Sequence, residues 1–207
     1  MSPPLFHLLC LLGYHYAMVD YRIRKANPED EPKASRVFDL VCSSLNRSGL
    51  DSWKRLYSEK TIKEDIDGGK LFLLLLGKSV IGSCSIDFNV EKSLFPVSQS
   101  FKKSGDLLEK IRYNGETVIV LERFHIHPEY QRKGLGKMFL TSLFAKFRET
   151  TMIASIEWDN ENAIAFFRKR GFMDLGEYGD LEIDPDKPRH LLYKAFKPEG
   201  LCRQANW

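Results

Sequence analysis

The fold is decided by Val118-Ile-Val-Leu-Glu-Arg-Phe-His-Ile126 and by the segment that follows it, His127-Pro-Glu-Tyr-Gln-Arg-Lys-Gly-Leu-Gly-Lys137. The first segment is apolar and rich in β-branched residues, which predicts a buried strand that ends before Pro128. The second is a short loop rich in glycine and cations, and apolar residues then recur at helical spacing over 138–148. The sequence therefore predicts a strand, a basic loop and a helix, in that order.

A basic loop at the start of a helix is suited to binding phosphate. The first backbone N–H groups of a helix have no partner within it, and the helix dipole favours an anion at that end. Gly134 and Gly136 would let the backbone approach a phosphate without an intervening Cβ. Arg132, Lys133 and Lys137 add positive charge, so we expect the loop to bind a small phosphorylated ligand.

Length and composition are those of one ordinary globular domain. The chain has 207 residues, of which 43% are hydrophobic and 29% charged, enough for a sizeable core. The net charge of +3 is small and the bases alternate with acids, so no nucleic-acid partner is expected. The cysteines stand far apart, which indicates neither a metal site nor a disulfide framework and favours a reduced, cytoplasmic location.

The first 17 residues are expected to form an extension outside the domain. Their apolar run, Leu5 to Leu12, is too short to span a membrane, so no membrane partner is expected. No Lys or Arg precedes the run, as one would in a signal peptide, although a targeting signal stays open as the alternative. The domain is then expected to cover 18–197, with a loose tail over 198–207.

Hydrophobic periodicity predicts a mixed α/β domain along the rest of the chain. Helices are expected over 30–46, from a capping box at Thr61 to Asp67, over 138–148 and over 160–170. Strands are expected over 21–25, 71–76, 80–88, 118–126, 152–157, 172–178 and 191–196, with a loop over 184–188 between the last two. The polar segment 91–116, with a short helix over 106–111, is either a functional loop or a solvated insertion.

Two motifs resemble those of the GCN5-related N-acetyltransferase (GNAT) superfamily. Gln131-Arg-Lys-Gly-Leu-Gly136 is similar to its [QR]-x-x-G-x-[GA] loop, and Asn160-x-x-Ala163-x-x-x-Phe167-x-x-x-Gly171-Phe172 is similar to its N-x-x-A-x-x-x-Y-x-x-x-G-F motif. Both stand in the family's order on the expected elements. The resemblance implies the acyl-CoA N-acyltransferase fold: a mixed, mostly antiparallel sheet flanked by helices, with splayed central parallel strands.

Two other phosphate-binding loops are excluded by spacing. A dinucleotide-binding fingerprint needs a third glycine where Phe139 stands. A P-loop needs Ser or Thr after its lysine, and Met138 occupies that position.

The resemblance implies that acetyl-CoA is the co-substrate, and it implies which residues bind it. In the family the basic loop binds the pyrophosphate of CoA, which here gives Gln131, Arg132, Lys133, Gly134, Leu135, Gly136 and Lys137. The pantetheine arm pairs with the strand before the loop, at Phe124, His125 and Ile126, in the manner of an added strand. Asn160 and Phe167 of the second motif complete the predicted cofactor site. The alternative for Arg132 and Lys133 is a solvated basic loop.

Glu122 is the candidate catalytic residue. Acetylation of an amine needs a base that takes its proton. Glu122 lies two residues before Phe124, beside the expected thioester, and several members of the family carry a carboxylate or histidine there. It is expected to be the base or the anchor of a cationic amine, and the alternative is a carboxylate paired with Arg123 or Lys110. Strict alternation along the strand would point His125 to the opposite face, which favours Glu122.

Phe167 departs from the family pattern, in which a tyrosine at this position protonates the departing thiolate. Either the thiolate leaves unaided, since the pKa of a thiol is about 8.5, or another hydroxyl, such as that of Tyr130 or Tyr178, replaces the missing one. In a third reading the site binds CoA and catalyses poorly.

The acceptor site is expected to be walled by Trp53, Tyr57, Asp65 and Tyr178, with simple packing as the alternative for the aromatic residues. Nearby acids favour a cationic acceptor. The implied activity is transfer of an acetyl group to a primary amine, of a small molecule rather than a protein, in a ternary complex. A CoA-binding regulatory or interaction module is the alternative. No metal is expected, and a homodimer is admitted because some members of the family dimerise.

Overall fold

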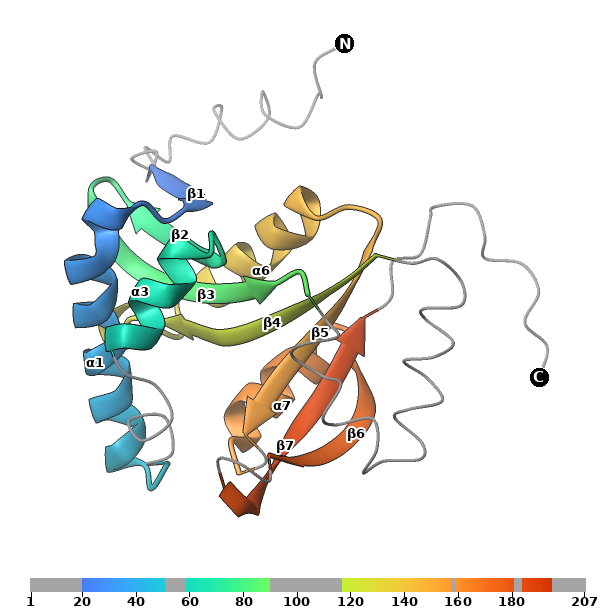
Figure 1. Ribbon diagram of the computed structural model, residues 1–207. Coiled ribbons are helices and arrows are strands. Elements are labelled where there is room, and N and C mark those ends of the chain that lie inside the picture. Colours follow the sequence, from blue (N-terminus) through green and yellow to red (C-terminus); the bar gives the residue numbers. More distant parts are fainter. Residues whose placement is uncertain (1–19, 51–58, 90–116, 158, 181–183, 195–207) are drawn as a thin grey trace, which may run out of the picture.

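A computed structural model describes residues 20–50, 59–89, 117–157, 159–180 and 184–194 (Figure 1). Within these ranges seven strands form one sheet in the order β1-β2-β3-β4-β5-β7-β6. The strands are β1 (Tyr21–Lys25), β2 (Leu71–Leu76), β3 (Ser79–Asp87), β4 (Thr117–Ile126), β5 (Thr150–Glu157), β6 (Met173–Asp180) and β7 (Asp184–Lys194). Only β4 and β5 pair in parallel among these neighbours, so the predicted mixed, mostly antiparallel sheet is confirmed.

Helices cover both faces of the sheet. They are α1 (Glu31–Arg47), α3 (Glu59–Asp67), α6 (Leu135–Lys146) and α7 (Glu161–Arg168), with short 3-10 turns at η2 (Pro28–Asp30) and η3 (Pro128–Tyr130). Figure 1 shows α1 and α3 on one face, with α6 and α7 behind the other. Side chains of β2 alternate between the two cores: Leu71 and Leu73 pack with α1 and α3, whereas Phe72 and Leu74 pack in the core of α6 and α7.

The two parallel strands diverge where the predicted site lies. They pair from Thr117 opposite Thr150 to Leu121 opposite Ala154. Beyond that point β4 continues to Ile126 paired only with β3, and β5 continues to Glu157 paired only with β7. Residues 122–126 and 155–157 therefore flank an opening in the sheet, which confirms the prediction of splayed central parallel strands.

A β-bulge interrupts β4 at the start of this opening. Arg123 and Phe124 together oppose the single residue Cys84 of β3, since the register shifts there. Arg123 has a φ of +49°, in the left-handed region that residues with a Cβ seldom adopt. As a result Leu121 and Phe124, three residues apart, both pack in the core of α6 and α7.

The bulge overturns the argument from alternation. The ring of His125 packs edge-on against Phe38 of α1, and the carboxylate of Glu122 contacts Arg123, which in turn contacts Asp65 of α3. Both side chains thus belong to the face covered by α1 and α3. The expectation that His125 points away from Glu122 is wrong, because the extra residue shifts the alternation by one position.

Three predicted element boundaries are also wrong. The expected loop over 184–188 lies within β7, where a second register shift places residues 185–188 in an irregular part of the ladder that tolerates two prolines. Helix α3 has already begun at Glu59, so Thr61 lies inside it and is not its N-cap. Helix α6 begins at Leu135, three residues before the predicted start.

Several predictions fall outside the described residues. These are the N-terminal extension over 1–17, the short helix over 106–111, the tail over 198–207, and the side chains of Trp53, Tyr57, Lys110 and Tyr178.

Candidate functional site

The basic loop joins β4 to the N-terminus of α6. Gly134, at a φ of +79°, is the N-cap of the helix, and nothing lies within 4 Å of the position that its Cβ would occupy. The side chain of Gln131 donates a hydrogen bond to the Ile126 carbonyl at 2.9 Å, which fastens the loop to the end of the strand. Gly134 adds no side chain in front of the N–H groups of the first turn, so this helix end is suited to an anion.

The two glycines of the loop have different roles. A Cβ on Gly136 would lie 3.2 Å from Cε2 of Phe166 and 3.7 Å from Cγ1 of Ile126. Its missing side chain therefore serves the packing of α6 against α7 and β4, a role that the sequence did not predict. The cationic side chains of Arg132, Lys133 and Lys137 are exposed, and Lys133 Nζ lies 5.4 Å above the ring of Tyr130.

A cavity of about 30 Å³ lies between the diverging strands. Both strands and α7 contribute to its lining, which consists of Leu121, Arg123, Phe124, Ser155, Ile156, Glu157, Asn160, Ala163 and Phe167. The Asn160 side-chain carbonyl accepts a hydrogen bond from the N–H of Ala163 at 3.1 Å and so caps α7. This cap does not use the amide nitrogen of Asn160, which can therefore donate to a ligand.

The α7 side of the cavity is aromatic. The ring of Phe124 lies 5.7 Å from that of Phe167 and 5.1 Å from that of Phe139, and Phe167 packs 5.0 Å from Phe172. Phe167 is buried and offers no proton to a departing thiolate. Tyr130 packs against His127 and Lys133 and is not among the residues that line the cavity.

A buried guanidinium lies on the opposite side, toward α1 and α3. The side chain of Arg123 is 8% exposed and donates to Asp65, which is equally buried, and to Glu122 Oε2 at 3.3 Å. Of the two predicted pairings of Glu122, the one with Arg123 is therefore present. The same arrangement ties Asp65 of α3, a predicted wall residue, to the strand beside the opening.

His125 is buried and fully hydrogen-bonded at its ring. Nδ1 lies 2.7 Å from the Arg123 carbonyl, which can only accept, so Nδ1 carries the proton and Nε2 accepts from the Ser83 hydroxyl at 3.1 Å. Burial lowers the pKa of His125 from 6.5 to about 4, and the neighbouring charge of Arg123 acts in the same direction. The imidazole is therefore neutral at physiological pH, and both of its ring nitrogens are engaged.

Sequence reasoning missed one residue of this region. Glu157 is the last residue of β5, is 6% exposed, and lines the cavity between the strands. Glu157 is the only charged residue of β5, and this was the available signal, but the sequence does not show that the strand ends at the opening.

The chain matches the model of the acetyltransferase (GNAT) family over residues 36–172. It belongs to this family. The match begins within α1 and ends just after α7, and so contains the loop, the opening and the buried ion pair.

Solved structures of GNAT proteins are similar to this chain in fold. A GNAT acetyltransferase from Streptococcus agalactiae matches with a TM-score of 0.69 and 15% identity, covering 86% of this chain and 96% of that one. The ribosomal-protein-S18-alanine N-acetyltransferase from Escherichia coli matches with a TM-score of 0.56 and 16% identity, covering 90% of this chain and 100% of that one. Arabidopsis thaliana Naa50, in complex with the bisubstrate analogue CoA-Ac-MVNAL, matches with a TM-score of 0.56 and 13% identity, covering 86% of this chain and 100% of that one.

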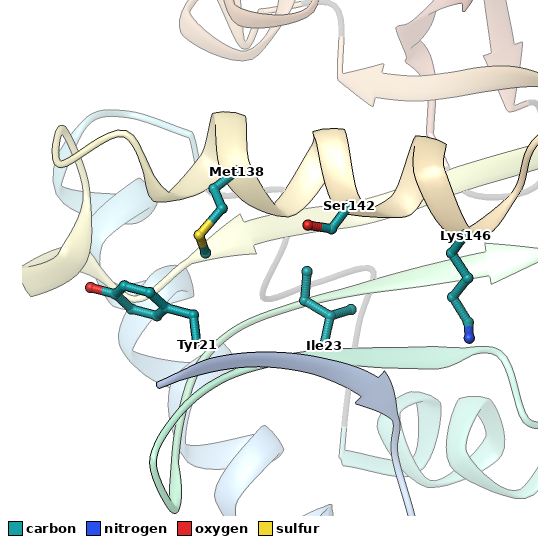
Figure 2. A pocket seen from close by; sticks show the side chains of 5 residues that line it. All are labelled: Tyr21, Ile23, Met138, Ser142 and Lys146. Carbon is teal, nitrogen blue, oxygen red and sulfur yellow. The ribbon is translucent and has the colours of Figure 1, made fainter. Parts of the chain in front are cut away.

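A larger cavity lies elsewhere on this GNAT domain, between β1 and α6 (Figure 2). It measures about 330 Å³ and is lined by Tyr21, Ile23, Met138, Ser142 and Lys146. These residues include neither a carboxylate nor an imidazole, the groups expected to take the proton of the amine. The smaller cavity between the strands is therefore the candidate site, because the charged side chains of Arg123 and Glu157, the latter a carboxylate, line it.

The described ranges also bear on metal binding and on membrane insertion. They contain no group of three or more His, Cys, Asp or Glu side chains that could hold a metal ion. No helix in them is both long and apolar enough to cross a membrane.

Removing the charge of Asp65 should destabilise the domain. In Asp65→Asn the buried Arg123 loses its closer carboxylate partner and keeps the longer contact with Glu122, and breaking a buried ion pair costs about 3–5 kcal/mol. Urea unfolding should show the loss. Asp67→Asn on the same helix is the matched control, because Asp67 is more than half exposed and should change stability by less than about 0.5 kcal/mol. Equal unfolding midpoints for the two variants would contradict the prediction.

The stability of the domain should fall in mild acid because of His125. Its folded pKa of about 4 lies below the unfolded value of 6.5, so the unfolded state binds the proton first as pH falls. The contribution is fully present above pH 6.5, is lost between 6.5 and about 4, and amounts to about 3 kcal/mol. Denaturant titrations across this range should show a shallower slope for His125→Gln than for the wild type. Identical slopes would refute the assignment.

Proposed function

We propose that this protein is an acetyl-CoA-dependent N-acetyltransferase that transfers the acetyl group to a primary amine of a small molecule. The observation that carries the proposal is the opening between β4 and β5. It has a basic helix N-terminus beyond the end of β4 and buried ionic side chains on one face. The GNAT family membership supports acetyl-CoA as the donor.

The residues present fit CoA. The N–H groups of the first turn of α6 and the exposed cations of the loop suit the pyrophosphate. Residues 124–126 of β4 do not pair with β5, so an extended pantetheine arm could lie against them as an added strand. The Asn160 amide nitrogen is then a donor to that arm. When bound, acetyl-CoA supplies the thioester that the amine attacks.

Transfer proceeds directly between the two substrates. Glu122 takes a proton from the incoming ammonium, and the neutral nitrogen attacks the thioester carbonyl. The C–N bond forms, the C–S bond breaks, the electron pair leaves with the sulfur, and the nitrogen releases its second proton to water to give the amide. Backbone N–H groups at the bulge suit the developing oxyanion, since a bulge leaves ladder positions unpaired. The sulfur leaves as a thiolate, which needs no acid because the pKa of a thiol is about 8.5.

The charges on the acceptor face favour a cationic amine. Arg123 is already engaged by Asp65 and Glu122, so two carboxylates oppose one guanidinium. An acceptor that carries its own carboxylate would meet repulsion here and find no free cation among these three residues. Simple alkylamines and diamines are therefore favoured over free amino acids.

The absence of a hydroxyl at Phe167 supports a second candidate. A GNAT domain without this acid could bind CoA as a regulatory or interaction module and turn over slowly. A thiol-release assay with acetyl-CoA and a panel of alkylamines, diamines, amino acids and peptides separates the two. The enzyme predicts release with cationic amines. Thermal stabilisation by CoA without release would favour the module, and release with peptides alone would favour a protein acceptor.

Glu122→Gln should lower kcat about 100-fold or more, because it removes the group that takes the amine proton. Stabilisation by CoA should be unchanged, since the substitution leaves the loop and the strand backbone intact. Glu129→Gln, at an exposed position in η3, is the control and should retain full activity. Retention of wild-type turnover by Glu122→Gln would discard the assignment of Glu122 as the base.

Phe167→Tyr should change kcat by less than about threefold, because a thiolate leaves without an acid near neutral pH. Phe167 lines the cavity, so a hydroxyl added at this position tests the departure of the thiolate directly. The initial rate of thiol release with saturating amine is the measurement. A gain of about tenfold or more would show that protonation of the thiolate limits the wild-type protein.

A further inference from the structure

The end of β5 carries a carboxylate that the mechanism above does not use. Glu157 is 6% exposed and lines the cavity between the strands together with Arg123 and Phe124. Its carboxyl group therefore lies beside the expected position of the thioester, where an incoming amine would arrive.

The side chain of Glu157 belongs to the acceptor face. Met152, Ala154 and Ile156 of β5 all pack in the core of α6 and α7. Since side chains alternate along a strand, Glu157 lies on the other face, the one covered by α1 and α3.

Glu122 of β4 lies on this same face, across the opening. The parallel ladder ends at Leu121 and Ala154, so Glu122 is one residue beyond it on β4 and Glu157 is three residues beyond it on β5. The opening is thus flanked by one carboxylate from each strand. Arg123, the guanidinium at the same cavity, is held by Glu122 and by Asp65 of α3.

We propose that Glu157 is an acceptor-binding residue that selects amines carrying a positive charge. The arriving ammonium donates hydrogen bonds to Glu157 on one side and to Glu122 on the other. Glu122 then takes one proton, and the neutral amine stays hydrogen-bonded to Glu157 while its lone pair attacks the thioester. This inference rests on the proposed acetyltransferase function and adds the residue that determines its acceptor class.

The test compares acceptors that differ in charge. Glu157→Gln should raise KM for an alkylamine such as 1,4-diaminobutane by about 10- to 100-fold, the worth of a hydrogen bond to a charged group. Its kcat should stay within about threefold, because Glu122 remains the base. For an amine that is uncharged at neutral pH, such as aniline or O-methylhydroxylamine, kcat/KM should change less than about twofold. Glu157→Asp keeps the charge and should retain the preference for the alkylamine.

Two control variants separate binding from structure. Glu161→Gln, exposed in the first turn of α7, should behave as the wild type. Arg189 stands opposite Glu157 in the ladder with β7, so a purely structural role would be a cross-strand one. In that case Glu157→Gln and Arg189→Gln would lower Tm alike and reduce kcat/KM equally for charged and uncharged amines. Such a result would overturn the proposal.

The failure of this inference is distinguishable from the failure of the proposed function. If none of the amines tested makes the wild type release thiol, the acetyltransferase assignment itself fails, and this inference fails with it. If the wild type acetylates alkylamines and Glu157→Gln does so with the same KM, only the role of Glu157 fails. Stabilisation by CoA, measured in parallel, should be the same in the wild type and in Glu157→Gln.

Discussion

The buried pairing of Arg123 with Asp65 is the interaction on which the rest of the site depends. Arg123 occupies a left-handed backbone conformation, which costs roughly 1–2 kcal/mol for a residue with a side chain. Its guanidinium is held by Asp65 of α3 and by Glu122, and this pairing offsets that cost at the position where β4 bulges. Without the bulge, the residues of β4 after Arg123 would point to the opposite faces of the sheet. Phe124 and His125 would then exchange sides.

One strand consequently supplies both halves of the proposed reaction. After the bulge, Phe124 packs on the side of α6 and α7, where the basic loop begins and CoA would bind. Glu122, Arg123 and His125 lie on the side of α1 and α3, where an amine would enter. The bulge is stabilised from that second side by the hydrogen bonds of His125 with Ser83 and with the Arg123 carbonyl. Stability and chemistry thus share the same few residues, so substitutions here should affect both.

Local patterns in the sequence were sufficient for most of the elements. Apolar runs and helical spacing predicted the strand, loop and helix around residues 118–148 and the order of the surrounding strands, because these patterns depend on neighbours in the chain. These patterns failed where contacts with residues distant in sequence determine the local structure. Thr61 reads as a helix start in isolation but lies inside α3, and the prolines after Asp184 suggest a loop although a register shift accommodates them in β7. Gly136 was expected to serve a ligand, yet a Cβ there would press on Phe166 of α7.

The sequence by itself determined the family of this protein, because the loop at 131–136 and the motif from Asn160 to Gly171 each lie within one short stretch of chain. Only the tertiary structure decided which side chains meet across the opening. The pairing of Asp65 with Arg123 joins residues 58 positions apart, and the approach of Glu157 to the same cavity depends on where β5 leaves β4. Such contacts are set by strand register and by one inserted residue, and neither is encoded in the spacing of any single motif.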